Sequence, residues 1–274
     1  MTPNSHSKSG TKQKTVWITG ASSGIGLAMA KKLACQGHIV YISGRNQDTL
    51  DQIVAPEDKG SAGLSGKLIA LPCDVTDDKA MARVLQDANI ESLDTIILSA
   101  GTCEYIDLPN LDIEKIRRVS DSNFFGVVNS CIAALPLLRK TAADPSRERP
   151  QIIGIGSMSS YVGFPRAEAY GSSKAAMSYF LHSLRCDLNK TIDVTVVYPG
   201  FVKTPMTDKN DFSMPFLMEV DEAADIILKK ADKRPLCIAF PSRLNLVLHT
   251  MQLFPRLWYS NIAARLSRPA EASS

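Results

Sequence analysis

A tyrosine and a lysine stand four residues apart in the stretch YGSSKAAM, as Tyr170 and Lys174. In a helix, residues at positions i and i+4 lie on one face, one turn apart. A lysine ammonium beside a tyrosine hydroxyl favours the ionised phenolate and so suits the tyrosine to proton transfer. Most pairs with this spacing are solvated surface residues, so the spacing alone leaves both interpretations open.

A glycine-rich segment, TGASSGIG at residues 19–26, joins a short apolar stretch to a helical pattern. Glycine permits a tight turn and close backbone approach, and the free N–H groups of a helix start can face a pyrophosphate. Glycine and serine also cap ordinary helices, so it is the position after a first strand that favours dinucleotide binding. The predicted cofactor contacts in this loop are Gly20, Ser22, Ser23, Gly24, Ile25 and Gly26.

Two further predicted strand ends bear on the identity of the dinucleotide. The second strand ends in SGRN, with Gly44 and Arg45 where NAD-binding chains usually carry an acidic residue for the ribose hydroxyls. An arginine suits a 2′-phosphate, so the sequence favours NADP(H) over NAD(H), although loop arginines are often simply solvated. After the third strand, Asp74 would accept from the adenine amino group while the Val75 backbone flanks the ring, or Asp74 would cap the following helix.

Strand and helix patterns alternate along the chain to about residue 240. Strands are predicted at 15–19, 38–44, 66–75, 93–101, 150–157, 192–200 and 235–240, and helices at 24–37, 48–55, 77–88, 112–139, 167–188 and 220–231. Strands that are apolar on both faces indicate an α/β, Rossmann-type, doubly wound parallel sheet with helices on both sides. We expect a flexible tail over residues 1–12, one NADP-binding catalytic domain over 13–241 and a helical extension over 242–274.

Composition and charge restrict the class of protein. The chain has 274 residues, of which 45% are hydrophobic and 22% charged, as in ordinary globular proteins. A net charge of +3 without a basic stripe gives no indication of a nucleic-acid partner. Six scattered cysteines without a CxxC motif predict reduced thiols and no metal site. With neither a signal peptide nor a spanning helix in the pattern, we expect a cytoplasmic protein.

The order of its motifs makes the chain resemble the short-chain dehydrogenases/reductases over residues 14–204. TGASSGIG resembles the nucleotide loop of that family, YGSSK its Y-x-x-x-K motif, and YPGFVKT the sequence after its sixth strand. Ser157 stands thirteen residues before Tyr170, which is the family's spacing. The segment from Ser99 to Gly101 resembles a fourth-strand motif that usually reads N-A-G.

The resemblance implies roles for four side chains. Tyr170 would be the general acid in carbonyl reduction and the base in alcohol oxidation, and Lys174 would favour its ionised form and bond the nicotinamide ribose. Ser157 would bond the substrate oxygen, and Asn123 would hold a water behind Lys174; by themselves they would be an ordinary loop serine and an exposed helix residue. The further cofactor contacts that it implies are Ser99, Ala100, Gly101, Tyr170, Lys174, Pro199, Gly200, Val202 and Thr204.

Three departures from the family pattern stand out. Ser99 replaces the first asparagine of N-A-G, for which we expect some loss of local rigidity, and Gly156 stands where a second serine is common. The usual V-D-G-G ending is absent. Because that ending helps to build tetramers in relatives, a tetramer is in doubt here and we expect a homodimer that forms through the long helices.

The sequence after residue 241 is apolar at helical spacing, at Leu244, Val247, Leu248, Met251 and Phe254. Three interpretations remain open: a helix that packs on its own domain or on a partner subunit, a lid over the site, or a weak peripheral membrane contact with Arg256 and Trp258 at the headgroups. The loop at 204–218 has apolar residues that would line an adaptable pocket or merely pack the loop down. They are Met206, Phe212, Met214, Phe216, Leu217 and Met218.

These features together predict an NADP(H)-dependent oxidoreductase that interconverts a carbonyl and a secondary alcohol on an apolar or lipid-like small molecule. Lys203, Lys209 and Arg166 lie near enough in sequence to leave a clamp for a substrate carboxylate open. The alternative from another class is an NADP-binding sensor or scaffold with little turnover. Sugar-nucleotide epimerases and dehydratases share Y-x-x-x-K, but they are generally longer, with a larger C-terminal substrate domain.

Overall fold

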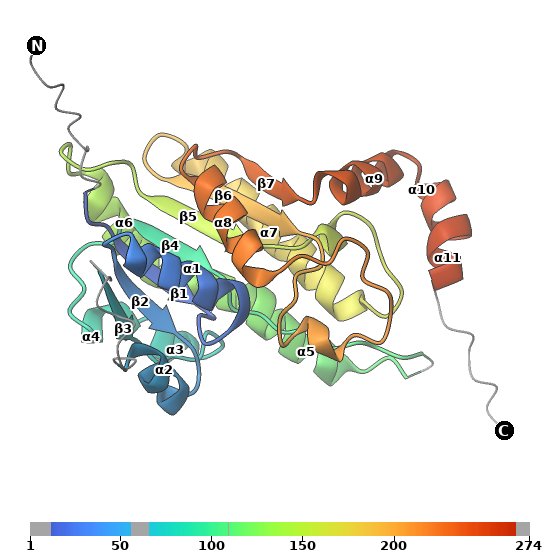
Figure 1. Ribbon diagram of the computed structural model, residues 1–274, viewed down its shortest axis with the longest axis horizontal. Coiled ribbons are helices and arrows are strands. Elements are labelled where there is room, and N and C mark those ends of the chain that lie inside the picture. The colour runs from blue at the N-terminus through green and yellow to red at the C-terminus, as the bar shows by residue number, and fades with distance from the viewer. Residues whose placement is uncertain (1–11, 56–65, 109, 267–274) are drawn as a thin grey trace, which may run out of the picture.

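The computed structural model describes residues 12–55, 66–108 and 110–266, and these residues form a parallel sheet covered by helices (Figure 1). The sheet has seven strands in the order β3-β2-β1-β4-β5-β6-β7. Its strands are β1 (Thr15–Thr19), β2 (Ile39–Ser43), β3 (Lys67–Ala70), β4 (Thr95–Leu98), β5 (Gln151–Ile155), β6 (Asp193–Pro199) and β7 (Cys237–Phe240). The predicted doubly wound fold is confirmed, and the predicted flexible tail lies almost wholly outside the described residues.

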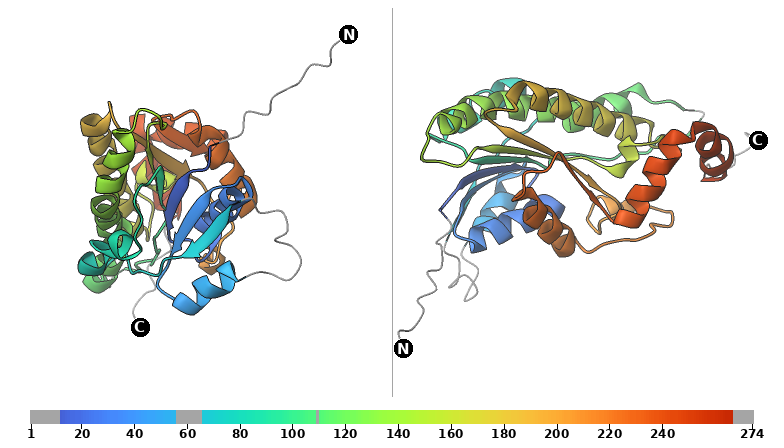
Figure 2. Two further views of the ribbon diagram at one scale, coloured as in Figure 1. Left: turned by 90° about the vertical axis from the view of Figure 1, so that its left-hand side faces the viewer. Right: turned by 90° about the horizontal axis from the view of Figure 1, so that it is seen from above.

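Two helical layers cover the sheet, one on each face (Figure 2). One layer contains α1 (Gly24–Cys35), α2 (Gln47–Val54) and α8 (Val220–Ala231). The other contains α3 (Asp78–Met81), α4 (Val84–Asp87), α5 (Ile113–Ser120), the π-helical turn η1 (Asp121–Phe125), α6 (Gly126–Ala142) and α7 (Glu168–Leu188). Side chains alternate between these layers along each strand, so Trp17 packs into one core cluster while Val16 and Ile18 pack into the other.

The long helix predicted at 112–139 is present at 113–142 and contains a π-helical turn. Asp112 caps it, because its carboxylate accepts from the backbone N–H groups of Glu114 and Lys115. A π turn inserts one extra residue into the helix and re-aims the side chains that follow. By length and hydropathy this helix would suffice to cross a membrane. One face of it, with Val127 and Leu138, packs into the core on the sheet, so in this fold the helix is a layer of the domain.

The single helix predicted at 77–88 is wrong, because the chain forms two short helices there, α3 and α4. Asp77 caps α3 by accepting from the backbone N–H of Ala80. The interruption after Met81 lets this side chain and those of Val84 and Leu85 enter the same core cluster. Burial of three apolar side chains outweighs the few hydrogen bonds of a continuous helix.

The chain after β7 forms α9 (Ser242–Leu253), α10 (Pro255–Leu257), the π-helical turn η4 (Trp258–Ile262) and α11 (Ala263–Leu266), at one end of the molecule (Figure 1). The predicted helical spacing is confirmed, and Pro255 starts a new helix because proline cannot continue α9. Leu248 and Trp258 are buried against the domain. The structure shows packing of these helices on their own domain, and the predicted place of Trp258 at lipid headgroups is wrong because its side chain is buried.

Candidate active site

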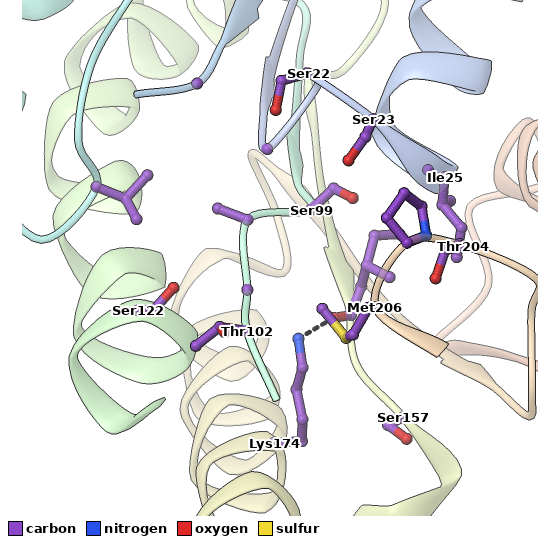
Figure 3. A pocket seen from close by; sticks show the side chains of 18 of the residues that line it. Ser22, Ser23, Ile25, Ser99, Thr102, Ser122, Ser157, Lys174, Thr204 and Met206 are labelled. Atoms are coloured by element: carbon purple, nitrogen blue, oxygen red, sulfur yellow. Dashed lines mark hydrogen bonds between the residues drawn. The ribbon is translucent and has the colours of Figure 1, made fainter. Parts of the chain in front are cut away.

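A cavity of about 550 Å³ opens where β1, β4, β5 and β6 end, and it is lined by residues from every motif singled out in the sequence. In Figure 3 Ser22 and Ser23 lie at one side, Thr204 and Met206 at another, and the Lys174 side chain extends from its helix toward the centre. Among the predicted site residues, the wall includes Gly20, Ser22, Ser23, Gly24, Ile25, Arg45, Asp74, Val75, Ser99, Ala100, Gly101, Ser157, Tyr170, Lys174, Pro199, Gly200, Val202 and Thr204. Gly26 and Asn123 are the two predicted residues that are not part of it.

The turn between β1 and α1 has the geometry of an anion cradle. Gly20 has φ +68°, and a Cβ there would lie 2.5 Å from the Cα of Ala100. At Gly26 a Cβ would lie 2.5 Å from the Gly20 carbonyl oxygen, so this glycine lets the helix pack onto the turn. Ser23 stands at the N-cap of α1 without a side-chain capping bond. The N–H groups of the first turn are therefore not taken by the ordinary serine cap and face the cavity.

Arg45 is exposed at the rim of the cavity, directly after β2. A Cβ at Gly44 would lie 3.2 Å from the Cβ of Ser22, so the segments after β1 and β2 lie close together here. The position after Gly44 thus carries a guanidinium at the rim of the cavity.

Asp74 and Val75 follow β3 at the same rim. The Asp74 carboxylate accepts from the backbone N–H of Thr76 at 2.9 Å and from its hydroxyl at 2.8 Å. It does not cap α3, since Asp77 does so, and the capping alternative for Asp74 is therefore wrong. Val75 is held by Asn129, whose side-chain amide donates to the Val75 carbonyl oxygen at 2.9 Å.

Ser157 follows β5 and begins a short turn on the cavity wall. Its hydroxyl oxygen accepts from the backbone N–H of Ser159 at 3.1 Å and lies 3.0 Å from the Ser159 hydroxyl. At Gly156 a Cβ would lie 2.8 Å from the Val197 carbonyl oxygen, so a larger residue there would require the backbone to shift. The backbones of β5 and β6 therefore approach closely directly before Ser157.

Tyr170 and Lys174 both come from the first two turns of α7. The Lys174 side chain is 4% exposed, and its ammonium donates to the Ile155 carbonyl oxygen at 2.8 Å (Figure 3). The ammonium lies 6.0 Å from the centroid of the Tyr170 ring. Glycine at position 101 makes room for it, because a Cβ there would lie 3.3 Å from the Lys174 nitrogen.

Burial shifts the pKa of both groups toward their neutral forms. It lowers the pKa of Lys174 to about 8, and the nearby thiol of Cys103 opposes this shift. It raises the pKa of Tyr170 to about 12, an effect that Cys103 reinforces and a hydrogen bond from Ser157 partly offsets. Tyr170 therefore carries its proton at neutral pH in the protein alone and is ready to act as an acid.

Asn123 lies behind the cavity wall, fully buried in the π-helical turn. Its amide oxygen accepts from the backbone N–H of Thr102 at 2.7 Å. Its amide nitrogen donates to the Thr102 carbonyl oxygen at 2.9 Å and to the Ser173 hydroxyl at 3.0 Å. The side chain thus ties the end of β4 to α7, next to Lys174, and it is not exposed on the helix surface.

Sequence reasoning missed the two partners of Asn123. Ser173 lies inside the YGSSK motif and Thr102 directly after SAG, so their positions beside Tyr170 and Gly101 are the only signal that the sequence offers.

The sequence also left Arg166 open as a clamp for a substrate carboxylate. In the structure Arg166 forms ion pairs with Asp107 at 2.6 Å and Asp211 at 3.1 Å, so its charge is already balanced.

The wall as a whole fits a dinucleotide. It combines a glycine cradle at a helix start, an arginine at the rim and a buried lysine at the far end. Among the residues that the structure describes, no group of three or more His, Cys, Asp or Glu side chains is arranged to hold a metal ion.

Comparison with known sequences identifies one family. The sequence model of the short chain dehydrogenases matches residues 14–213. The chain is 34% identical over 257 residues to an uncharacterized oxidoreductase of Myxococcus xanthus, covering 92% of this chain and 97% of that protein. It is 34% identical over 239 residues to a fatty acyl-CoA reductase of Acinetobacter baylyi, covering 83% of this chain and 76% of that protein.

Solved structures share the fold over nearly the whole chain. A short-chain dehydrogenase of Burkholderia cenocepacia in complex with NADP has a TM-score of 0.76 at 23% identity, covering 94% of this chain and 98% of that one. A short-chain dehydrogenase of Sphingobium yanoikuyae in complex with NADPH has a TM-score of 0.74 at 25% identity, covering 95% and 99%. A 3-oxoacyl-[acyl-carrier protein] reductase of Brucella melitensis with bound NAD has a TM-score of 0.71 at 24% identity, covering 84% and 90%.

Burial of Lys174 predicts a pH-dependent stability. Below about pH 8 the folded protein holds a buried charge that the unfolded chain exposes to water, and this penalty is relieved as the pH rises to 10.5. Relative to Lys174→Met, the wild type should gain up to about 3 kcal/mol of unfolding free energy over this range. Urea unfolding of both proteins at several pH values measures the difference, and parallel curves would show that the ammonium carries no burial penalty.

Proposed function

The chain belongs to the short-chain dehydrogenase family of oxidoreductases, and from this premise we propose that it uses NADP(H) to interconvert a carbonyl group and a secondary alcohol. The observation that carries the proposal is the convergence of Ser157, Tyr170 and Lys174 on a cavity that also contains the glycine cradle. A protein that only binds a dinucleotide has no need of a proton donor at the end of its site. No observation favours the alternative of a sensor or scaffold with little turnover.

The proposed chemistry divides between the cofactor and the chain. The nicotinamide supplies or accepts the hydride, and the protein orients it and moves the proton. In the reduction, the Tyr170 hydroxyl donates its proton to the carbonyl oxygen, and in the oxidation the phenolate takes it from the alcohol. The Ser157 hydroxyl donates a hydrogen bond to the same oxygen and stabilises the negative charge that develops there.

Lys174 and Asn123 act behind these two groups. With the cofactor bound, the ammonium of Lys174 would bond the ribose of the nicotinamide and would favour the phenolate of Tyr170. Because the amide of Asn123 is engaged with Thr102 and Ser173, we assign it first to holding Lys174 in place. A water that Asn123 helps to hold would then be bound beside the hydrogen bonds that link Asn123 to Thr102 and Ser173.

The diphosphate of the proposed cofactor would lie at the start of α1, on the turn from Gly20 to Gly26. The adenine would lie between Asp74 and Val75. Segments after β4 and β6, with the predicted contacts from Ser99 to Gly101 and from Pro199 to Thr204, would flank the nicotinamide. A Cβ at Gly24 would lie 3.3 Å from Thr204, so these segments already meet over the cradle.

We propose an apolar or lipid-like substrate. Met206 lines the cavity, and Phe212 packs on Tyr105 and Phe201 in the loop that leads away from it. Of the three cations considered as a carboxylate clamp, Arg166 is paired with two aspartates and Lys203 lies 3.5 Å from Glu219. The similarity to a fatty acyl-CoA reductase points in the same direction.

Turnover with and without the Tyr170 hydroxyl tests the proposed function. We expect NADPH oxidation with ketones and aldehydes, rising with chain length, and a loss of about 100-fold or more in kcat for Tyr170→Phe. Binding of NADPH, followed by its fluorescence, should persist in this variant because the cradle is unchanged. Turnover that survives the substitution would remove Tyr170 from proton transfer, and cofactor binding without any turnover across the panel would favour the sensor.

The preference for NADP(H) is proposed from Arg45 and Gly44. A guanidinium hydrogen-bonded to a phosphate contributes about 1.5–3 kcal/mol, which corresponds to about 10- to 100-fold in affinity. Arg45→Asp should therefore weaken NADPH binding by this factor and leave NADH binding unchanged or improved. Arg83→Asp, on an exposed turn between α3 and α4, is the matched control. An unchanged ratio of NADPH to NADH affinity would show that Arg45 does not contact the cofactor.

We propose that the chain is a cytoplasmic homodimer. The cytoplasm is supported by five cysteines, Cys73, Cys103, Cys131, Cys186 and Cys237, that form no disulfide within the described residues. The dimer is supported by large apolar side chains on the outer face of the long helix and of α7: Phe125 is 51% exposed, Ile132 59% and Tyr179 78%. A dimer that buries these faces would leave the cavity open at the end of the sheet.

A charge on this face should separate the subunits. Light scattering should give the mass of two 29.8 kDa chains for the wild type and of one for Ile132→Glu, because an unpaired carboxylate is costly inside an apolar interface. Leu236→Glu, at a leucine of similar exposure at the start of β7, should remain dimeric. A wild type with the mass of one chain would contradict the proposal.

A further inference from the structure

Residues 242–266, here called the tail, are fixed on the loop that follows Ser157. The indole N–H of Trp258 donates to the Gly163 carbonyl oxygen at 2.8 Å, and the Gly163 N–H donates to the Tyr259 hydroxyl at 3.2 Å. The Gln252 amide donates to the Tyr161 carbonyl oxygen at 2.9 Å. These bonds hold one face of the tail against the domain, so its other face keeps a defined position.

That outer face is apolar and uncovered. Leu246 and Leu253 are seven residues apart in α9 and so lie on one side of this helix. Val247 and Phe254 directly follow them and are exposed as well. Exposed fractions are 68% for Leu246, 52% for Val247, 77% for Leu253, 56% for Phe254, 45% for Leu257 and 37% for Ile262. Since the inner face is apolar as well, α9 has the pattern of a helix that is covered on both sides.

The charge of the tail indicates what covers it. Exposed arginines stand at Arg243, Arg256 and Arg265, and residues 242–266 contain no aspartate or glutamate. In a contact between the tails of two copies, neither tail would offer an acidic side chain to balance these arginines. An apolar face with basic residues instead matches the surface of a bilayer that contains anionic lipids.

The tail begins beside the segment after β6 that lines the cavity, since a Cβ at Gly200 would lie 3.0 Å from the Leu244 side chain. The tail and the loop after β6 lie toward the same end of the molecule in Figure 1 and in the right-hand view of Figure 2. In that loop Phe216 is 51% exposed and Leu217 45%. Arg166, three residues after Gly163, pairs with Asp211 of the same loop and so links it to the segment that holds the tail.

We propose that the outer face of the tail docks on a membrane surface that contains anionic phospholipids, with the cavity mouth turned toward the bilayer. Leu253 and Phe254 insert among the headgroups and acyl chains, and the arginines lie at the level of the phosphates. The loop with Phe216 and Leu217 then meets the same surface. The docking does not depend on the proposed catalytic roles, and an apolar substrate would enter the cavity from the lipid.

Flotation of the whole protein with lipid vesicles tests this docking. The protein should bind vesicles of phosphatidylcholine mixed with phosphatidylglycerol, bind phosphatidylcholine alone much less, and be released by salt. Leu253→Glu should lower the partition coefficient about tenfold or more, because it places a carboxylate in the apolar contact. Leu236→Glu, at an exposed leucine directly before β7 and outside the tail, should bind like the wild type.

A second pair of variants tests the charge. Arg256→Gln should weaken binding to the anionic vesicles, and Arg83→Gln, a matched exposed arginine away from the tail, should not. Circular dichroism checks the fold, and Leu253→Ser replaces Leu253→Glu if the charge prevents folding.

Three outcomes would overturn the proposal. They are a wild type that floats with neither kind of vesicle, a Leu253 variant that binds as well as the wild type, and an Arg256→Gln variant that binds no differently from Arg83→Gln. Light scattering adds a fourth: if Leu253→Glu halves the mass of the protein in solution and Leu236→Glu does not, the face is an interface between copies. Because these experiments measure vesicle binding and not turnover, failure of the docking proposal is distinguishable from failure of the proposed oxidoreductase activity.

Discussion

The buried ammonium of Lys174 is the constraint on which the site depends. A charge that is 4% exposed is tolerated only where polar groups are aimed at it, and here the Ile155 carbonyl oxygen accepts from it at 2.8 Å. This bond requires the end of β5, the end of β4 and the start of α7 to meet within a few ångströms. Gly101 leaves the space, since a Cβ there would lie 3.3 Å from the ammonium, and Asn123 ties two of the three segments together.

The same constraint explains how one fold provides both an acid and a cofactor site. Parallel strands bring their carboxyl ends to one edge of the sheet, where helix starts and loop side chains converge. Burial keeps Tyr170 protonated by raising its pKa to about 12, and it lowers the pKa of Lys174 to about 8. A positive charge added beside this pair would lower the pKa of Tyr170, against the effect of burial, and would lower the pKa of Lys174 further. The two residues therefore respond to what occupies the cavity.

Much of this was predictable from the sequence, and the failures have physical reasons. The bounds of β1 and α8 were predicted correctly because a glycine turn and a run of acidic residues mark where they begin or end. The break between α3 and α4 was not predicted, because it depends on which side chains reach the core. The sequence placed Asn123 on a helix, but its partners Thr102 and Ser173 are 21 and 50 residues away, and only the folded chain brings them together. The helical spacing of apolar residues likewise predicted helices in the tail, but it did not predict that the tail packs on the loop after Ser157.

Ionisation of Tyr170 tests the central claim most directly. The difference in ultraviolet absorbance between the wild type and Tyr170→Phe, followed against pH, isolates this tyrosine from the other six. The account predicts a pKa of about 12 for Tyr170 in the protein alone and a fall of at least one pH unit when oxidised NADP is bound. An ordinary pKa near 10 in the free protein, or a value that NADP leaves unchanged, would contradict the account that burial and the cofactor set this proton.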